Sequence, residues 1–126
     1  WFGRRSERFA ARYLRRHGFR ILAANVLDRR GELDLIALDP DRRTLVVVEV
    51  RSTATPDPQR AADSVDAAKQ RQVSGAALRF LTRRRLLGVP VRFDVLAVAW
   101  PAGAREPTVL HLRHAFESTG RFQMFS

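Results

Sequence analysis

Two apolar segments joined by a turn constrain the fold of this chain most strongly. Residues 33–38 (LDLIAL) and 44–51 (TLVVVEVR) have the composition of β-strands, and the intervening residues 39–43 (DPDRR) favour a turn. We therefore predict an antiparallel hairpin closed by a four-residue turn over residues 40–43. Because residues 45–48 are apolar at every position, the second strand is expected to be central and covered on both faces.

The length of the turn fixes the register of this hairpin. A five-residue turn would give a different pairing, so the prediction depends on the four-residue turn. Opposed side chains point to the same face of a sheet, which makes each pair a set of neighbours. The expected pairs are Leu38 with Leu45, Ile36 with Val47, Asp34 with Glu49, and Glu32 with Arg51.

The opposed carboxylates of Asp34 and Glu49 are the candidate reactive pair. Their Cβ atoms would lie about 5 Å apart, and two such carboxylates repel each other unless positive charge lies between them. Carboxylate and carbonyl oxygens are the ligands that Mg²⁺ prefers, so a divalent cation would satisfy both groups. The alternative is a structural ion network in which Arg30, Arg51 or Arg92 neutralises the pair.

Two charged residues outside the hairpin are further candidates. Glu7 borders the inner face of a helix predicted over residues 5–17, where it would add a third carboxylate or simply favour the start of the helix. Lys69 lies on the inner flank of a helix predicted over residues 64–87. It would hold a phosphate or the attacking water, or else extend along the surface.

The remaining pattern predicts a single layered α/β domain over residues 1–126, with the element order αβββαββ. A polar loop is expected over residues 52–62. Asp94 is expected to form an internal ion pair with Arg92. Further strands are predicted over residues 19–22, 91–100 and 108–112. The histidines are expected at boundary or surface positions: His17, His111 and His114. The C-terminal segment is expected to have aromatic anchors at Phe116, Phe122 and Phe125.

The charge distribution favours a polyanionic partner. The net charge is +10, and an acidic segment over residues 21–50 lies between basic segments over 1–20 and 51–88. A protein that brings a metal to phosphate would use both signs. Without cysteine, disulfides and Cys-ligated zinc are excluded. No membrane span or signal peptide is visible, so we expect a cytoplasmic protein with no membrane partner.

The segments GELDLIA (residues 31–37) and VEVR (residues 48–51) resemble the signature of the PD-(D/E)XK nucleases. Over nearly its whole length the chain resembles the UPF0102/YraN family, whose relatives include Holliday junction resolvases. This resemblance implies a restriction-endonuclease-like fold, with a mixed β-sheet and an antiparallel hairpin flanked by helices. It further implies hydrolysis of DNA phosphodiesters with Mg²⁺ or Mn²⁺, and branched or flapped DNA is among the candidate substrates.

The resemblance also assigns roles to individual residues. The metal ligands would be Asp34, Glu49, the carbonyl of Val50, and Glu7. Arg51 stands where the signature has its catalytic lysine, and Ser6 stands where the family usually has glycine. Arginine stays charged and manages a water proton poorly, but it stabilises a developing negative charge, a role that Lys69 would share. The residues expected to hold the nucleic-acid backbone are Arg4, Arg5, Arg8, Arg12, Arg30 and Arg71.

Two other functions remain open at this point. A catalytically inactive nucleic-acid-binding module would keep the acidic pocket, with Arg51 in a standing salt bridge to Glu32 or Glu49. A basic interaction protein would instead dock on a protein–nucleic acid assembly. No small-molecule cofactor is expected, and because the resolvase relatives act as dimers, a homodimer also remains open.

Overall fold

The computed structural model describes residues 3–118 and begins with helix α1 (Gly3–Arg16). One stripe of this helix is buried, at Ser6, Ala10 and Leu14, while its arginines are exposed. The spacing of the buried residues is that of an amphipathic helix lying on the sheet. No helix among the described residues is long and apolar enough to cross a bilayer.

The centre of the molecule is a five-stranded sheet with the strand order β1-β2-β3-β4-β5. β3 and β4 are parallel and the other neighbours are antiparallel, so the predicted mixed sheet with an antiparallel hairpin is confirmed. The apolar start of β3 is buried in its central position, as expected. The strands are β1 (Arg20–Asp28), β2 (Gly31–Leu38), β3 (Leu45–Thr53), β4 (Val91–Ala99) and β5 (Thr108–Phe116).

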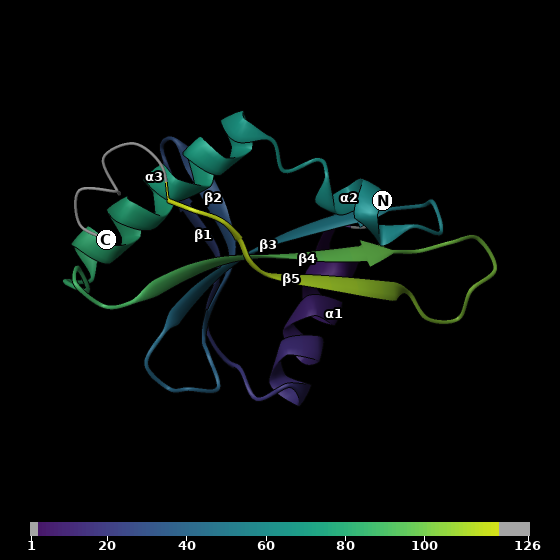
Figure 1. Ribbon diagram of the computed structural model, residues 1–126, viewed down its shortest axis with the longest axis horizontal. Helices are drawn as coiled ribbons and strands as arrows, with labels where there is room; N and C mark the ends of the chain where they lie inside the picture. Colours follow the sequence, from purple (N-terminus) through teal and green to yellow (C-terminus); the bar gives the residue numbers. More distant parts are fainter. Residues whose placement is uncertain (1–2, 119–126) are drawn as a thin grey trace.

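Helices cover both faces of the sheet (Figure 1). α2 (Pro58–Ala62) and α3 (Ala67–Arg83) pack on one face over a core that includes Val47 and Val95. α1 packs on the opposite face over a second core that includes Val46 and Val48. Alternate side chains of β3 therefore enter two different cores, which explains why residues 45–48 of this strand are apolar at every position.

The sheet divides near the middle of β2. Pairing between β2 and β3 ends at Leu35 and Val48, although β3 stays paired with β4 as far as Thr53. The β1–β2 ribbon separates from β3 beyond this point and runs beneath α3 (Figure 1). Within the gap, the backbone N–H of Val50 donates a hydrogen bond to Oδ2 of Asp34 over 2.9 Å. A side chain thus takes the place of the next backbone partner in the ladder.

The structure confirms part of the predicted hairpin and corrects its far end. Leu38 pairs with Leu45 and Ile36 with Val47, as the four-residue turn requires. The expected pairings of Asp34 with Glu49 and of Glu32 with Arg51 are wrong for the ladder, because the strands have separated before these positions. The side chains of Asp34 and Glu49 still interact. Glu32 pairs instead with Leu27 of β1.

Several boundaries also differ from the prediction. The segment expected to be a polar loop contains α2, whose Asp57 caps the helix by accepting from the N–H of Gln59, with Pro58 in the first turn. The order is therefore αβββααββ rather than αβββαββ. β1 is longer than predicted because it pairs with β2 along most of its length. α3 ends at Arg83, earlier than the predicted Leu87. Arg85, just beyond the helix, adopts a left-handed φ of 56°.

Asp94 forms the expected internal ion pair. It is fully buried and accepts two hydrogen bonds from the Arg92 guanidinium, over 2.8 and 3.0 Å. Nε2 of His111 lies 2.9 Å from the same carboxylate, an acid partner that the sequence pattern does not indicate. Phe116 is buried at the end of β5, whereas Phe122 and Phe125 lie outside the described residues.

Candidate functional site

Charged side chains from four elements meet where β2 separates from β3. β2 contributes Asp34 and β3 contributes Glu49, the pair expected from the hairpin register. α1 brings Glu7 from one face of the sheet, and α3 brings Lys69 from the other face. The gap between the strands is what allows both helices to reach one site.

Three carboxylates form one cluster at this gap. Oxygen atoms of Glu7, Glu32 and Asp34 lie within 4.8 Å of one another. The pKa of Glu7 is raised, because burial disfavours its charged form and because the negative charges of Asp34 and Glu32 are close. A cation between these groups would relieve the repulsion that raises this pKa.

Asn25 of β1 lies beside the same carboxylates. With its amide nitrogen turned toward them, it donates to Oε1 of Glu7 over 3.0 Å and to Oε1 of Glu32 over 3.1 Å. Its backbone has a left-handed φ of 52°, which asparagine tolerates better than most residues. Asn25 therefore holds two acidic side chains together without supplying a full positive charge.

Glu49 is the most deeply buried acid of the site, with 3 % of its surface exposed. Its pKa is raised to about 8, first by burial and then by the negative charge of Asp34 and a hydrogen bond with it. The positive charge of Lys69, whose Nζ lies 3.7 Å from Oε1 of Glu49, acts in the opposite direction. The buried carboxylate thus has one nearby ammonium group and remains destabilised in its charged form.

The first turn of α3 determines where Lys69 lies. Asp66 caps this helix, and its carboxylate accepts the backbone N–H of Lys69 over 2.9 Å. The side chain of Lys69 is 23 % exposed, so the group that meets the buried Glu49 is also accessible to solvent. The ammonium group of Lys69 therefore lies beside the acids, and its predicted role with a phosphate or the attacking water stays a prediction.

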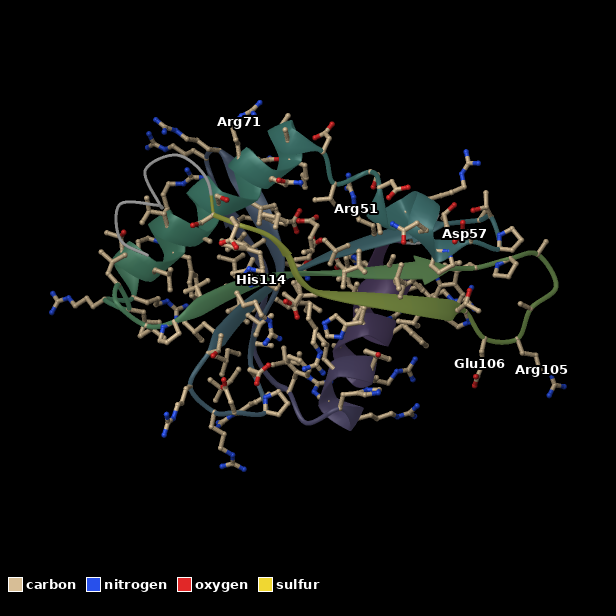
Figure 2. The ribbon with its side chains drawn as sticks, in the orientation of Figure 1. Arg51, Asp57, Arg71, Arg105, Glu106 and His114 are labelled. Carbon is tan, nitrogen blue, oxygen red and sulfur yellow. The ribbon has the colours of Figure 1, made fainter. Side chains whose placement is uncertain are left out.

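Arg51 is hydrogen-bonded to Ser64, and its positive charge still acts on Glu49, whose pKa it lowers. Its Nε donates to Oγ of Ser64 over 2.9 Å, so that it tethers β3 to the segment between α2 and α3 (Figure 2). Neither this arginine nor Arg30 nor Arg92 makes an ion pair with Asp34 or Glu49 among residues 3–118. The expected network is therefore not formed as arginine salt bridges: Lys69 makes the ion pair with Glu49, and Arg51 contributes through its charge alone.

An open groove of about 1100 Å³ runs between α1 and β1 and reaches this site. Glu7 and Glu32 lie at its floor together with Asn25, and exposed arginines follow its α1 side. Four of the predicted nucleic-acid-binding residues line it, whereas Arg30 and Arg71 do not, and Figure 2 shows Arg71 directed outward from α3. The arginines of the groove are Arg4, Arg5, Arg8, Arg12 and Arg15.

Two residues of the site were not predicted from the sequence. Glu32 lies two positions before Asp34 on the same strand, and this spacing could have indicated a shared site. Asn25 gave no such signal, because its role depends on a left-handed backbone and on contacts that only the fold creates. The Val50 carbonyl was expected to face a metal, and the contact that the structure records is through its N–H.

The donor set is chemically suited to a hard divalent cation. Up to four carboxylates converge without a histidine or cysteine among them, which is the ligand chemistry of Mg²⁺ and Mn²⁺ rather than of zinc. Exposed arginines of α1 and the carboxylates of Glu7 and Glu32 line the same groove, so positive and negative charge lie side by side there.

Comparison with known proteins identifies the family. The model of the uncharacterised protein family UPF0102 matches residues 6–98. A UPF0102 protein of Rhodopirellula baltica, RB9115, is 48 % identical over 119 residues, which cover 94 % of this chain and 71 % of the relative. A UPF0102 protein of Pseudomonas fluorescens is 44 % identical over 117 residues, or 92 % of this chain and 93 % of the relative.

One solved structure is also similar, at a low level. The SPO1766 protein of unknown function from Silicibacter pomeroyi has a TM-score of 0.42 and 15 % identity, over 99 % of this chain and 81 % of that protein. This likeness is too distant to support an argument, so the assignment rests on the family model and the curated relatives. By both of these, the chain belongs to the UPF0102 family.

Proposed function

We propose that this protein is a metal-dependent nuclease of the PD-(D/E)XK type, with a restriction-endonuclease-like fold, that hydrolyses DNA phosphodiesters. The observation that carries the proposal is the convergence of Asp34 and Glu49 in a gap of the sheet. Burial and the nearby charge of Asp34 keep Glu49 destabilised in its charged form. Such an arrangement costs stability, and a divalent cation between the carboxylates would offset that cost.

The acidic residues would hold the metal. Asp34 is shared between two groups, since it lies with Glu7 and Glu32 on one side and interacts with Glu49 on the other. When bound, Mg²⁺ or Mn²⁺ supplies a water of lowered pKa and neutralises phosphate charge. Asn25 would keep Glu7 and Glu32 in place, and the N–H of Val50 would fix the orientation of the Asp34 carboxylate.

Lys69, rather than Arg51, would perform the role of the lysine in the signature. Its ammonium group lies beside Glu49, whereas Arg51 is engaged with Ser64. Unlike arginine, lysine can exchange a proton with a reacting water. The arginine at the motif position is then compatible with catalysis, because a residue from α3 replaces it in space.

The substrate backbone would lie in the groove beside α1. Its arginines, including Arg8 and Arg12, provide contacts to phosphates that do not depend on sequence. The carboxylates at the floor would then face a phosphodiester held by the arginine wall. Branched and flapped DNA remain candidate substrates, because they expose a backbone where strands separate.

A cleavage assay tests this function. Wild-type protein should cut branched, flapped or single-stranded DNA in the presence of Mg²⁺ or Mn²⁺. Asp34→Asn should reduce cleavage to background while retaining DNA binding, and Lys69→Met should lower the rate about a hundredfold. Glu117→Gln, which removes an exposed acid that lies just after β5 and lines neither groove of α1, is the matched control. Absence of cleavage of all these substrates by the wild type would contradict the proposal.

A second candidate function is a catalytically inactive nucleic-acid-binding module. The observation that favours it is Arg51 itself, because an arginine occupies the motif position of the catalytic lysine. For such a module, Asp34→Asn would leave DNA affinity unchanged, metal would have no effect on binding, and no substrate would be cut. The same assay therefore distinguishes the two functions.

A further inference from the structure

A second groove, of about 360 Å³, borders the opposite side of α1. Arg5 and Arg12 line both this groove and the one that reaches the carboxylates, so α1 forms the wall between them. The second groove contains no acidic cluster. Its other lining side chains include Phe9, Tyr13, His17, Trp100, Arg16 and Arg105.

Flat side chains in this groove are already stacked in pairs. The guanidinium carbon of Arg5 lies 4.0 Å from the ring centroid of Trp100. The rings of Tyr13 and His17 lie 4.1 Å apart at 29°. Nε1 of Trp100 donates to the buried Oγ of Ser6 over 2.8 Å, which fixes the edge of the indole. The groove therefore presents planar surfaces whose orientation is set before a ligand arrives.

The charge of the groove complements a phosphate backbone. Four arginines and a single acid, Glu106, are among its lining residues. Arg105 and Glu106 lie on the connection between β4 and β5, at the end of the molecule remote from α3 (Figure 2). Planar side chains combined with arginines are typical of surfaces that bind unpaired nucleic acid, because bases stack while phosphates pair.

Unpaired bases fit this surface better than a duplex does. In a duplex the faces of the bases are covered by their neighbours, so they are not available to Tyr13, His17 or Trp100. An acidic peptide would satisfy the arginines but would gain little from the planar faces. The pairing of flat and positive groups therefore favours a single strand.

We propose that this second groove binds an unpaired strand of nucleic acid, with bases stacked on the Arg5–Trp100 and Tyr13–His17 pairs. The proposal rests on the nuclease function, in that the same substrate would meet the carboxylates on the other side of α1. A junction between paired and unpaired DNA then becomes the substrate class, with α1 lying at the point of separation.

Fluorescence of Trp100 tests the stacking directly. The chain has two tryptophans, so a Trp1→Phe background reports Trp100 alone. In EDTA, an oligothymidylate of about 12 nucleotides should quench this signal. It should also bind at least about fivefold more tightly than an abasic strand of equal length and charge. Equal affinity for the two strands, or no binding of either, would overturn the proposal.

Variants separate stacking from charge. His17→Ala, at an exposed position, should reduce the preference for thymidylate over the abasic strand, whereas Arg105→Ala should weaken both strands alike. Arg85→Asn is the matched control, since it removes one exposed arginine at the far end of α3 and asparagine tolerates the left-handed backbone there. A full preference retained in His17→Ala would contradict the stacking.

Two further arms separate this proposal from others. An acidic peptide of the same charge should compete poorly, and equal competition would overturn the proposal in favour of a protein ligand. Asp34→Asn should retain both quenching and strand preference. A wild type that shows the strand preference but cuts none of the substrates would contradict only the nuclease function, whereas a wild type that cuts DNA without any strand preference would contradict only this groove.

Discussion

At the scale of the residue, Glu49 shows most clearly that this fold carries a functional cost. A buried carboxylate in an apolar central strand would be replaced by an aliphatic side chain if stability alone mattered. Instead it lies beside a second carboxylate, and Lys69 at 3.7 Å only partly compensates the two. Its retention is explained if the site binds a cation that the side chains alone do not replace.

The raised pKa of Glu49 predicts how stability depends on pH without divalent cations. Folded Glu49 keeps its proton up to about pH 8, whereas the unfolded chain releases it near the ordinary pKa of 4.5. The folded state therefore binds more protons between these values, and the free energy of unfolding should fall as the pH rises through them. Urea unfolding in EDTA should show this decrease for the wild type and a smaller one for Glu49→Gln.

The comparison with Glu49→Gln also predicts which of the two proteins is more stable at alkaline pH. Glu49→Gln should be more stable than the wild type at pH 8, because it removes the cost of a buried charge. Addition of Mg²⁺ should stabilise the wild type and leave Glu49→Gln nearly unchanged. A variant with the same pH dependence as the wild type would show that Glu49 is not the group that titrates.

Asn25 allows backbone and side-chain effects to be measured separately. Asn25→Ala should destabilise the protein by roughly 1 to 2 kcal/mol, since it loses the amide contacts to Glu7 and Glu32 and places alanine at a left-handed φ. Asn25→Gly should cost less, because glycine accepts that backbone freely. Equal losses in urea unfolding would mean that the backbone conformation contributes nothing.

At the scale of the element, the sequence predicts the hairpin well and its end poorly. Strand periodicity and the turn at residues 40–43 determine the register from Leu38 to Leu35. Beyond that point the ladder is interrupted by a side chain, Asp34, which accepts the N–H of Val50. No hydrophobic pattern records such a contact, so the separation of the sheet could not be predicted, although Glu7 and Lys69 were expected at the site.

Local chemistry explains the other differences. Two prolines indicated a loop before α3, but Asp57 followed by Pro58 is also a helix-start signal, and the short α2 forms there. The left-handed conformation that ends the predicted long helix falls at Arg85 rather than at a glycine, so composition placed the boundary too late. Each of these errors arises where the same residues are compatible with two local structures.

One hydrogen bond links α1 to Trp100, the residue after β4, and adds to the apolar packing of α1 on the sheet. Ser6→Ala removes the hydroxyl oxygen that accepts the hydrogen bond from Nε1 of Trp100. The substitution should lower the free energy of unfolding by about 1 kcal/mol. The same substitution in a Trp100→Phe background should cost less, because that indole N–H is absent. A double-mutant cycle in urea without a coupling energy would contradict this role for Ser6.

At the scale of the whole molecule, charge is sorted by location. Exposed arginines of α1 line the groove, while acids gather at its floor where β2 leaves β3. A net charge of +10 favours general attraction to polyanions. The net charge does not show that acidic side chains are gathered at one place within the basic surface. The fold thus places a cluster of carboxylates and a row of arginines along one groove.

The salt dependence of DNA binding measures how many phosphates the arginines of the α1 groove contact. For a short duplex in EDTA, the plot of log affinity against log salt should have a negative slope. Arg8→Ala should make it shallower by about 1, because one phosphate contact is lost. Arg85→Asn should leave the slope unchanged. If both variants change the slope equally, DNA is bound by overall charge and not in the groove.

The central claim is that the carboxylates at the division of the sheet bind a divalent cation, and calorimetric titration of Mg²⁺ and Mn²⁺ tests it most directly. Wild-type protein and Glu117→Gln should show saturable binding that Asp34→Asn lacks. Near neutral pH, binding should release protons, detected as a buffer-dependent enthalpy, because Glu49 must ionise. Absence of saturable binding, even with DNA present, or equal binding by Asp34→Asn, would contradict the claim.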